Sequence, residues 1–341
     1  MQYQSESVGD SDLRAMEWRG NSLRILDQRL LPSQRVWIEC CEVAELAAAI
    51  RDGAVAGPSA AGIAAAYGVA LAAQRIGAAT DWGAALADDF VLLEAARPSS
   101  ATLCWALRMM REHLKRPRSA HVDVPELLVR TAELIQVSDA EANLATGKIG
   151  MQLIRKQDRR PQELLTYGYT GALSGGGRGT ALEVLRAAHS AGLVATVHTT
   201  PGKPASSGEL TAWELGMAEI PVTLHADAAL GHLMKTHSPS WVIVGAERIA
   251  ANGDLVAQLG TYSLAVLAMH HGLRFMVVAP STAIDLGLEH GDDLELGEVG
   301  SGCSLDMTPA DLIDMIVTEK GVVLRPGPEG VAELLSQRRL H

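Results

Sequence analysis

The chain is poor in the residues that mark secreted, metal-bound or nucleic-acid-binding proteins. It has four cysteines in 341 residues, and their positions (40, 41, 104 and 303) show neither metal-ligand spacing nor a disulfide framework, which is typical of a reducing cytosol. Its 29 Lys and Arg residues form no dense run and are outnumbered by 40 Asp and Glu, for a net charge of −11. We therefore expect no nucleic-acid-binding surface.

The sequence also lacks an apolar run long enough to cross a membrane. The most apolar segment, Ala60–Ala73, is shorter than the ~20 residues that a spanning helix needs, and no signal peptide is recognisable at the start of the sequence. We therefore expect a soluble cytoplasmic protein. With 48% hydrophobic residues, the chain has enough apolar side chains for two domains of about 150 residues each.

The hydrophobic pattern divides the chain in two. Residues 15–18 and 22–26 predict a hairpin closed by a Gly-Asn turn, and residues 36–40 predict a third strand. Five helical segments follow, at residues 43–53, 60–73, 82–96, 99–114 and 125–157. From residue 163 on, short apolar strands alternate with helices, as in a parallel doubly wound sheet. The sequence thus predicts an α/β protein, with a small N-terminal sheet and helical bundle over residues 1–150 and a Rossmann-like domain over residues 151–341.

A glycine-rich turn between a strand and a helix is the clearest candidate ligand loop. The apolar strand Leu164–Tyr167 leads into six glycines, at positions 168, 171, 175, 176, 177 and 179, and a helix follows from Thr180. Glycines let the backbone approach a ligand, and the first free amides of a helix favour an anion. A tight turn that holds nothing is the alternative. The segment Thr170–Gly177 fits a dinucleotide loop, but the next strand ends at His198 rather than at an acidic residue, so we expect no nicotinamide cofactor.

Ligands of doubly wound sheets bind beyond the carboxyl ends of the strands. The segments predicted to lie there are 167–169, 198–200, 225–227, 246–248 and 280–282. Glu247 stands out, because a carboxylate in the apolar context VIVGAERIA is partly desolvated, which suits general acid–base work. An ion pair with Arg248 is the alternative. His198, His225 and His232 are not spaced as metal ligands, so we expect hydrogen-bonded histidines and no metal.

Ordered blocks along nearly the whole chain resemble methylthioribose-1-phosphate isomerase, the methionine-salvage member of the initiation factor 2B alpha/beta/delta family. The blocks include GIAAAYG at 62–68, LTAWEL at 210–215, VIVGAERIAANG at 242–253, GTYSLAVLA at 260–268 and TEKGV at 318–322. The resemblance implies a homodimer that converts a phosphorylated aldose into a ketose without a metal, nucleotide or other cofactor.

The catalytic positions implied by the resemblance are substituted in this chain. The family's cysteine falls at Gly168, next to Tyr169, and its catalytic aspartate falls at Glu247, which keeps the carboxyl group but moves it by one methylene. A shift of about 1 Å can cost on the order of a hundredfold in rate. We expect Glu247 to carry the proton transfer, with Tyr169 or a water doing part of the cysteine's task.

Several of the sugar-phosphate contacts that the resemblance implies are also substituted. Gly57, Arg97 and Gly171 are candidate substrate contacts, and Arg97 keeps the family's arginine. An arginine, a glutamine and a lysine of the family fall at Ala56, Ser206 and Gln258. Each lost charge-assisted bond is worth roughly 1.5–3 kcal/mol, so we expect inefficient turnover of the family's substrate.

These substitutions leave three functions open. The first is a divergent isomerase acting on a sugar phosphate or a related sugar, the second a non-catalytic ligand-binding or regulatory paralogue, and the third the salvage isomerase at reduced rate. We favour the first, because Glu247, the glycine loop and Arg97 still converge while no long partner-binding extension is present.

Overall fold

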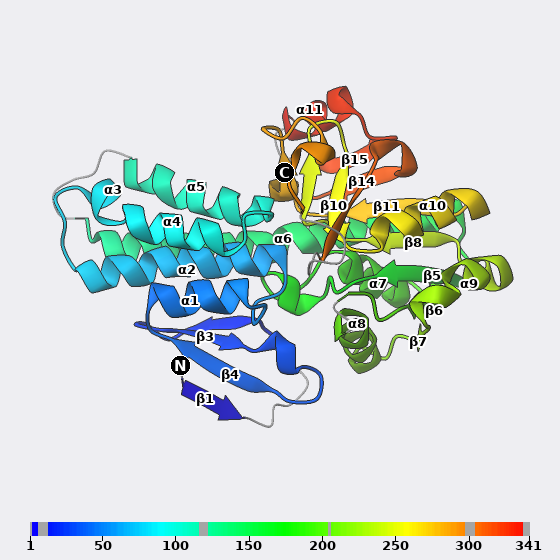
Figure 1. Cartoon of the computed structure of the whole chain (residues 1–341). Coiled ribbons are helices and arrows are strands. Elements are labelled where there is room, and N and C mark those ends of the chain that lie inside the picture. The colour runs from blue at the N-terminus through cyan, green and yellow to red at the C-terminus, as the bar shows by residue number, and fades with distance from the viewer. Residues whose placement is uncertain (1, 6–12, 116–121, 204–205, 297–303, 337–341) are drawn as a thin grey trace. The chain divides into compact units, whose positions relative to one another are not determined.

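The computed structural model describes residues 2–5, 13–115, 122–203, 206–296 and 304–336 (Figure 1). The chain forms two compact units, one of residues 1–140 and 172–177 and the other of residues 141–171 and 178–341. The middle of the glycine-rich loop thus belongs to the first unit and its two ends to the second. None of the described helices is long and apolar enough to cross a membrane.

The first unit begins with a four-stranded antiparallel sheet in the order β1-β4-β3-β2. Its strands are β1 (Gln2–Ser5), β2 (Met16–Trp18), β3 (Leu23–Leu26) and β4 (Val36–Cys40). The predicted hairpin is confirmed: β2 pairs with β3, and the turn contains Gly20 at φ +89°, a conformation that favours glycine. The sequence did not predict β1, because its residues QYQS show no apolar alternation.

Helices make up the rest of the first unit. They are α1 (Val43–Arg51), α2 (Pro58–Ile76), α3 (Trp82–Ala85), α4 (Ala87–Ala96), α5 (Ala101–Lys115) and the start of α6 (Val124–Gln157). All five predicted helical segments are helical, with residues 82–96 divided into α3 and α4. Helix α2 is buried all round from Ser59 to Ala73, because its small side chains let neighbours pack closely. A Cβ atom at Gly62 would lie 2.8 Å from the carbonyl oxygen of Thr102.

The second unit is built on a seven-stranded sheet in the order β15-β14-β11-β8-β5-β6-β7. The strands are β5 (Gln162–Tyr167), β6 (Val194–Thr199), β7 (Val222–Leu224), β8 (Trp241–Val244), β11 (Arg274–Val278), β14 (Met315–Thr318) and β15 (Gly321–Leu324). All neighbours pair in parallel except β14 and β15. From β7 to β14 this is the Rossmann strand order 3-2-1-4-5-6, so the predicted fold class is confirmed.

Helices cover both faces of this sheet. They are α7 (Ala181–Ser190), α8 (Ser206–Met217), α9 (Leu230–His237), α10 (Thr261–His271) and α11 (Pro328–Ser336). Because side chains alternate along a strand, Leu165 and Val242 join the apolar cluster under α9, α10 and α11, whereas Leu164 and Ile243 join the cluster under α7.

A second, small sheet of short strands was not predicted from the sequence. Its strands are β9 (Arg248–Ala250), β10 (Leu255–Gln258), β12 (Ile284–Asp285) and β13 (Leu305–Thr308), in the order β12-β9-β10-β13. Runs of two to four residues show too little periodicity to be recognised. Single 3₁₀ turns also occur, namely η1 (Gln28–Leu30), η2 (Ala172–Ser174), η3 (Asp227–Ala229), η4 (Ser281–Ala283), η5 (Gly291–Asp293) and η6 (Ala310–Leu312).

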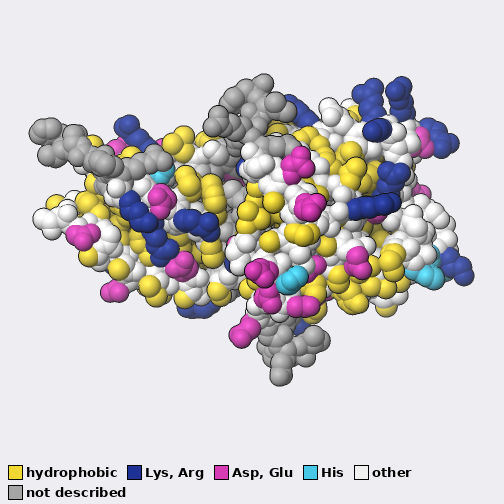
Figure 2. All heavy atoms as spheres, turned by 90° about the horizontal axis from the view of Figure 1, so that it is seen from above, with side chains coloured by type: hydrophobic (Ala, Val, Ile, Leu, Met, Phe, Trp, Pro, Cys, Tyr) yellow, Lys and Arg dark blue, Asp and Glu magenta, His cyan; other side chains and the backbone are white. Residues whose placement is uncertain are grey.

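The surface drawn in Figure 2 carries charges of both signs. Lys and Arg side chains are spread among acidic and apolar ones on this face and are not joined in one continuous stripe. This distribution agrees with the scattered basic residues of the sequence.

Candidate functional site

The strand order of the second unit places a topological switch between β5 and β8. From β5 the chain continues to β6 and β7 on one side, whereas β8, β11 and β14 follow on the other. Open α/β sheets bind ligands beyond the carboxyl ends of the strands at such a switch. The segments found there are Tyr167–Tyr169 at the end of β5 and residues 246–248, which follow β8 and reach the start of β9. The structure thus brings together two of the segments that the sequence predicted.

Gly168 has a backbone that a cysteine would fit poorly. Its φ is +75°, in the left-handed region that favours glycine. A Cβ atom there would lie 2.6 Å from Oε1 of Gln258, so the amide of Gln258 occupies space that a thiol-bearing side chain would need. The carbonyl of Gly168 accepts a hydrogen bond of 2.7 Å from Thr211 Oγ1. The turn is therefore held in place from α8.

Gln258, the last residue of β10, lies between the turn at Gly168 and the start of α8. Its Nε2 donates a hydrogen bond of 2.8 Å to Ser207 Oγ. The structure therefore brings Gln258 to Gly168, but its partner on α8 is Ser207, not Ser206. Ser206 is the half-buried first residue of that helix, and Ser207 is buried. The sequence does not distinguish the two serines, because only the helix phase decides which one faces inward.

Tyr167, at the end of β5, is hydrogen-bonded to the segment that follows β10. Its hydroxyl donates a hydrogen bond of 2.7 Å to the carbonyl of Leu259, and a Cβ atom at Gly260 would lie 2.2 Å from that hydroxyl. Burial, together with the carboxylates of Asp227 and Asp306, raises the pKa of Tyr167 above its ordinary value of 10. The hydroxyl consequently stays a hydrogen-bond donor at neutral pH.

Tyr169 and Gly171 both meet a buried carboxylate on α8. The hydroxyl of Tyr169 donates a hydrogen bond of 2.5 Å to Oε2 of Glu214. Arg186 binds Oε1 of the same carboxylate and also donates to Glu183 Oε2 at 3.1 Å. A Cβ atom at Gly171 would lie 2.1 Å from Glu214 Oε2. Gly171 therefore lets the loop pass close to this network, which the sequence did not reveal.

Glu247 lies in the turn between β8 and β9. Only 5% of the residue is exposed, and its backbone N–H donates a hydrogen bond of 2.9 Å to the carbonyl of Val256 on β10. Its neighbour Arg248 forms an ion pair of 2.8 Å with Asp285. The small sheet therefore fixes the backbone of Glu247 and gives Arg248 a carboxylate partner of its own. A buried carboxylate at the switch has the chemistry for proton transfer.

The remaining two predicted contacts belong to the first unit. Gly57 is the N-cap residue of α2, and a Cβ atom there would lie 2.1 Å from the Cα of Ser174. Arg97 follows α4, and its Nη1 donates a hydrogen bond to the carbonyl of Ala56. The structure thus brings Arg97 to the segment that contains Gly57, two stretches separated by about forty residues in sequence.

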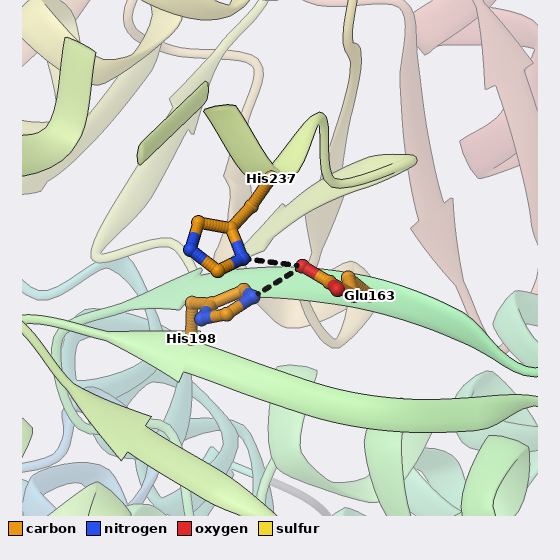
Figure 3. A group of neighbouring side chains, drawn as sticks. All are labelled: Glu163, His198 and His237. Atoms are coloured by element: carbon orange, nitrogen blue, oxygen red, sulfur yellow. Dashed lines mark hydrogen bonds and ion pairs between the residues drawn. The ribbon is translucent and has the colours of Figure 1, made fainter. Parts of the chain in front are cut away.

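Three histidines and a glutamate gather on one face of the large sheet. His198 Nε2 and His237 Nδ1 lie 2.9 Å and 3.2 Å from Glu163 Oε2 (Figure 3). His198 Nδ1 lies 3.0 Å from His225 Nε2. The expectation of hydrogen-bonded histidines is confirmed for His198 and His225, while His237 was missed because it ends a helix far away in sequence. Burial, and then the proximity of His198 and His237, lowers the pKa of His225 below 6.5.

Comparison with known sequences identifies relatives along the whole chain. Residues 54–301 match the profile of the Initiation factor 2 subunit family. The chain is 51% identical to a protein of Pseudomonas paraeruginosa named methylthioribose-1-phosphate isomerase, and the match covers 96% of this chain and 97% of the relative. A protein of the same name from Pseudomonas putida is 50% identical over the same shares.

Two solved structures share the fold over nearly all of the chain. The 5-methylthioribose 1-phosphate isomerase of Pyrococcus horikoshii superposes with a TM-score of 0.80 at 32% identity, covering 94% of this chain and 95% of that one. The delta subunit of translation initiation factor eIF-2B from A. fulgidus superposes with a TM-score of 0.77 at 31% identity, covering 95% of this chain and all of that one. The same fold therefore occurs in an isomerase and in an initiation-factor subunit.

Proposed function

Because the chain belongs to the Initiation factor 2 subunit family and is 51% identical to methylthioribose-1-phosphate isomerases, we propose that it is an aldose–ketose isomerase of a sugar phosphate. Methylthioribose 1-phosphate, named in those relatives, is the substrate to test first, which would place the protein in methionine salvage. The chain is a divergent member of the group, since glycine and glutamine stand where the resemblance places a cysteine and a lysine.

One observation carries this proposal: a buried carboxylate follows β8 at the topological switch. Isomerisation of an aldose to a ketose moves hydrogen between two adjacent carbons, and a positioned carboxylate can take up the proton and return it. Glu247 is 5% exposed and is held by the β9–β10 hairpin. It is one methylene longer than the family's aspartate, so we expect a slower reaction than that of the relatives.

The other predicted residues have supporting roles in this proposal. Arg97 is the proposed cation for the phosphate, because a guanidinium binds phosphate oxygens through two parallel hydrogen bonds. Gly171, Ser206 and Gln258 are the proposed sugar contacts of the second unit, and Gly57 is proposed on the resemblance alone, because Ser174 fills the space beside it. Tyr169 would assist proton transfer in place of the missing cysteine.

The test is turnover by the purified protein. Methylthioribose 1-phosphate and a panel of ribose phosphates are supplied, and ketose formation is followed by NMR. Glu247→Gln keeps the shape of the side chain and removes the proton carrier, so we expect kcat to fall by about 10²–10⁴-fold. Glu329→Gln, at an exposed position at the start of α11, should leave kcat unchanged. Equal turnover by wild type and Glu247→Gln overturns the proposed role.

A second candidate function is supported by the turn after β5. A cysteine at position 168 would require the Gln258 amide to move, so the turn as it stands suits a ligand-binding or regulatory protein without catalysis. A thermal shift with the sugar phosphate, without ketose formation, would favour this function.

The assembly and location are parts of the same proposal. We propose a homodimer, since Tyr262, Val266 and Met269 expose apolar side chains at helical spacing along α10. Light scattering after size exclusion should report twice the chain mass, and a monomer would contradict the proposal. A cytoplasmic location agrees with the free thiols of Cys40 and Cys41.

A further inference from the structure

We propose that Glu163, His198 and His237 form a binding site for one divalent metal ion of the zinc class on the face of the sheet under α9. The proposal concerns a group of side chains to which the isomerase proposal assigns no part, and it does not depend on that proposal. Among the described residues, these three form a group of potential ligands whose donor atoms all lie within 4.8 Å of one another.

The register of the sheet explains why two of the ligands converge. Strands β5 and β6 are parallel neighbours, and Leu165 pairs with His198. Side chains two residues apart on a strand point to the same face, so Glu163 and Leu165 share the face of His198. Helix α9 packs on this face through Leu230, Leu233 and Met234. Its last residue, His237, therefore reaches the carboxylate from above (Figure 3).

Two of the three distances between ligand atoms are close to those of a tetrahedral zinc site. Bonds of about 2.0–2.1 Å to nitrogen and oxygen place tetrahedral ligand atoms about 3.3–3.4 Å apart. The carboxylate oxygen of Glu163 lies 2.9 Å from His198 Nε2 and 3.2 Å from His237 Nδ1. The ligand nitrogens of His198 and His237 lie within 4.8 Å of each other. Two histidines with one carboxylate form the donor set of zinc sites that keep a fourth, open position.

Solvent can reach that fourth position. The side chains of His237 and Glu163 are 49% and 35% exposed, whereas that of His198 is 3% exposed. An ion can therefore enter from the side of His237 and keep a water ligand. The buried imidazole and the strand that carries it supply the rigid part of the site.

A further histidine, His225, lies within hydrogen-bond distance of the proposed ligand His198. Metal-bound histidines almost always hydrogen-bond through their second ring nitrogen, which fixes the tautomer and the ring orientation. His198 Nδ1 lies 3.0 Å from His225 Nε2. With a metal on Nε2 of His198, its Nδ1–H donates to His225 Nε2, and His225 carries its own proton on Nδ1. His225 is thus a positioning residue and not a ligand.

Metal binding would connect β5, β6 and α9. Since a metal that binds only the folded chain stabilises it by mass action, the second unit should unfold at a higher temperature with metal than without. This effect can be measured without any substrate, so failure of the isomerase proposal leaves the test unchanged.

The experiment uses the full chain without an affinity tag, freed of metals by a chelator. Zn²⁺ is titrated by calorimetry, and Co²⁺ is added separately to record the visible absorption of a tetrahedral nitrogen–oxygen site. We expect one equivalent to bind, a rise in the melting temperature, and a tetrahedral Co²⁺ spectrum. Absence of saturable binding at one equivalent, or an octahedral spectrum only, overturns the proposal.

Variants locate the site. His237→Ala removes an exposed ligand at the end of α9 and should weaken binding on the order of 100-fold or more, whereas His225→Ala should weaken it about 10–100-fold with unchanged stoichiometry. His232→Ala is the matched control, because His232 is an exposed histidine on the same helix. It should bind as the wild type does. Equal affinities of His237→Ala and His232→Ala would place the metal elsewhere and refute the assignment.

Discussion

Replacing Glu214 by alanine is expected to destabilise the second unit strongly. Glu214 is 3% exposed. Its carboxylate accepts a hydrogen bond of 2.5 Å from the hydroxyl of Tyr169 and pairs with the guanidinium of Arg186. Alanine removes this carboxylate, so Arg186 loses one of its anionic partners. The side chain of Arg186 is largely buried, with 24% of it exposed.

The expected cost follows from these contacts. Removing one partner of a buried ion pair costs about 3–5 kcal/mol, and a hydrogen bond to a charged group contributes roughly 1.5–3 kcal/mol. Arg186 keeps contacts of 3.1 Å to Glu183 and 2.7 Å to the carbonyl of Arg178, so we expect the lower end, about 3 kcal/mol. At about 2–4 °C per kcal/mol for a unit of this size, the melting temperature should fall by roughly 6–12 °C.

Calorimetry of wild type and variant measures this fall. Glu209→Ala is the matched control, since Glu209 is an exposed glutamate on the same helix, and its cost should stay within about 0.5 kcal/mol. A double-mutant cycle with Arg186→Ala should show a coupling of about 1–3 kcal/mol between Glu214 and Arg186. If Glu214→Ala lowers the free energy of unfolding by less than about 1 kcal/mol, or if the two substitutions are additive, the contacts of Glu214 with Tyr169 and Arg186 do not stabilise the unit as proposed.

Two further predictions concern Gly168 and Asp306. Gly168→Cys should cost about 1–2 kcal/mol of stability, because the backbone of Gly168 is left-handed. Gly168→Cys combined with Gln258→Lys exchanges both positions for the residues that the resemblance places there, so isomerase turnover should rise at least about tenfold. A double variant no faster than wild type would contradict this. Burial raises the pKa of Asp306 above 3.8, although the amides of Gly260 and Tyr262 lower it in part. The stability that Asp306 contributes is therefore present in full below pH 3.8 and is lost as the pH rises through its folded-state pKa. The free energy of unfolding of wild type minus that of Asp306→Asn should accordingly fall as the pH rises above about 4 in urea titrations, and a flat or rising difference would contradict this sign.

Much of the fold was predictable because it rests on local patterns. The helical segments from residue 43 to residue 157, the hairpin at Gly20 and the alternation after residue 163 all come from periodicity and turn residues, and the structure confirms them. The small sheet of β9, β10, β12 and β13 was not predictable, since its strands are two to four residues long and are stabilised by pairing with one another.

The candidate site was predictable only in part. Tyr167–Tyr169 and Glu247 follow apolar strands, and a general rule about strand ends brings them to one edge. The sequence could not reveal that Ser207, rather than Ser206, meets Gln258, or that Tyr169 meets Glu214. Those contacts depend on helix phase and on the approach of α8 to the loop, which are set by packing.

The sequence by itself determined the family, the two kinds of architecture and the candidate site residues, because these are properties of residue identity and order. Tertiary structure alone decided which of these residues touch. Gln258 fills the space beside Gly168, and His237 joins Glu163 and His198 from a helix about forty residues further along. Both contacts join separate elements of the chain. Such residues come together only through the register of the parallel strands and the packing of a helix on the sheet.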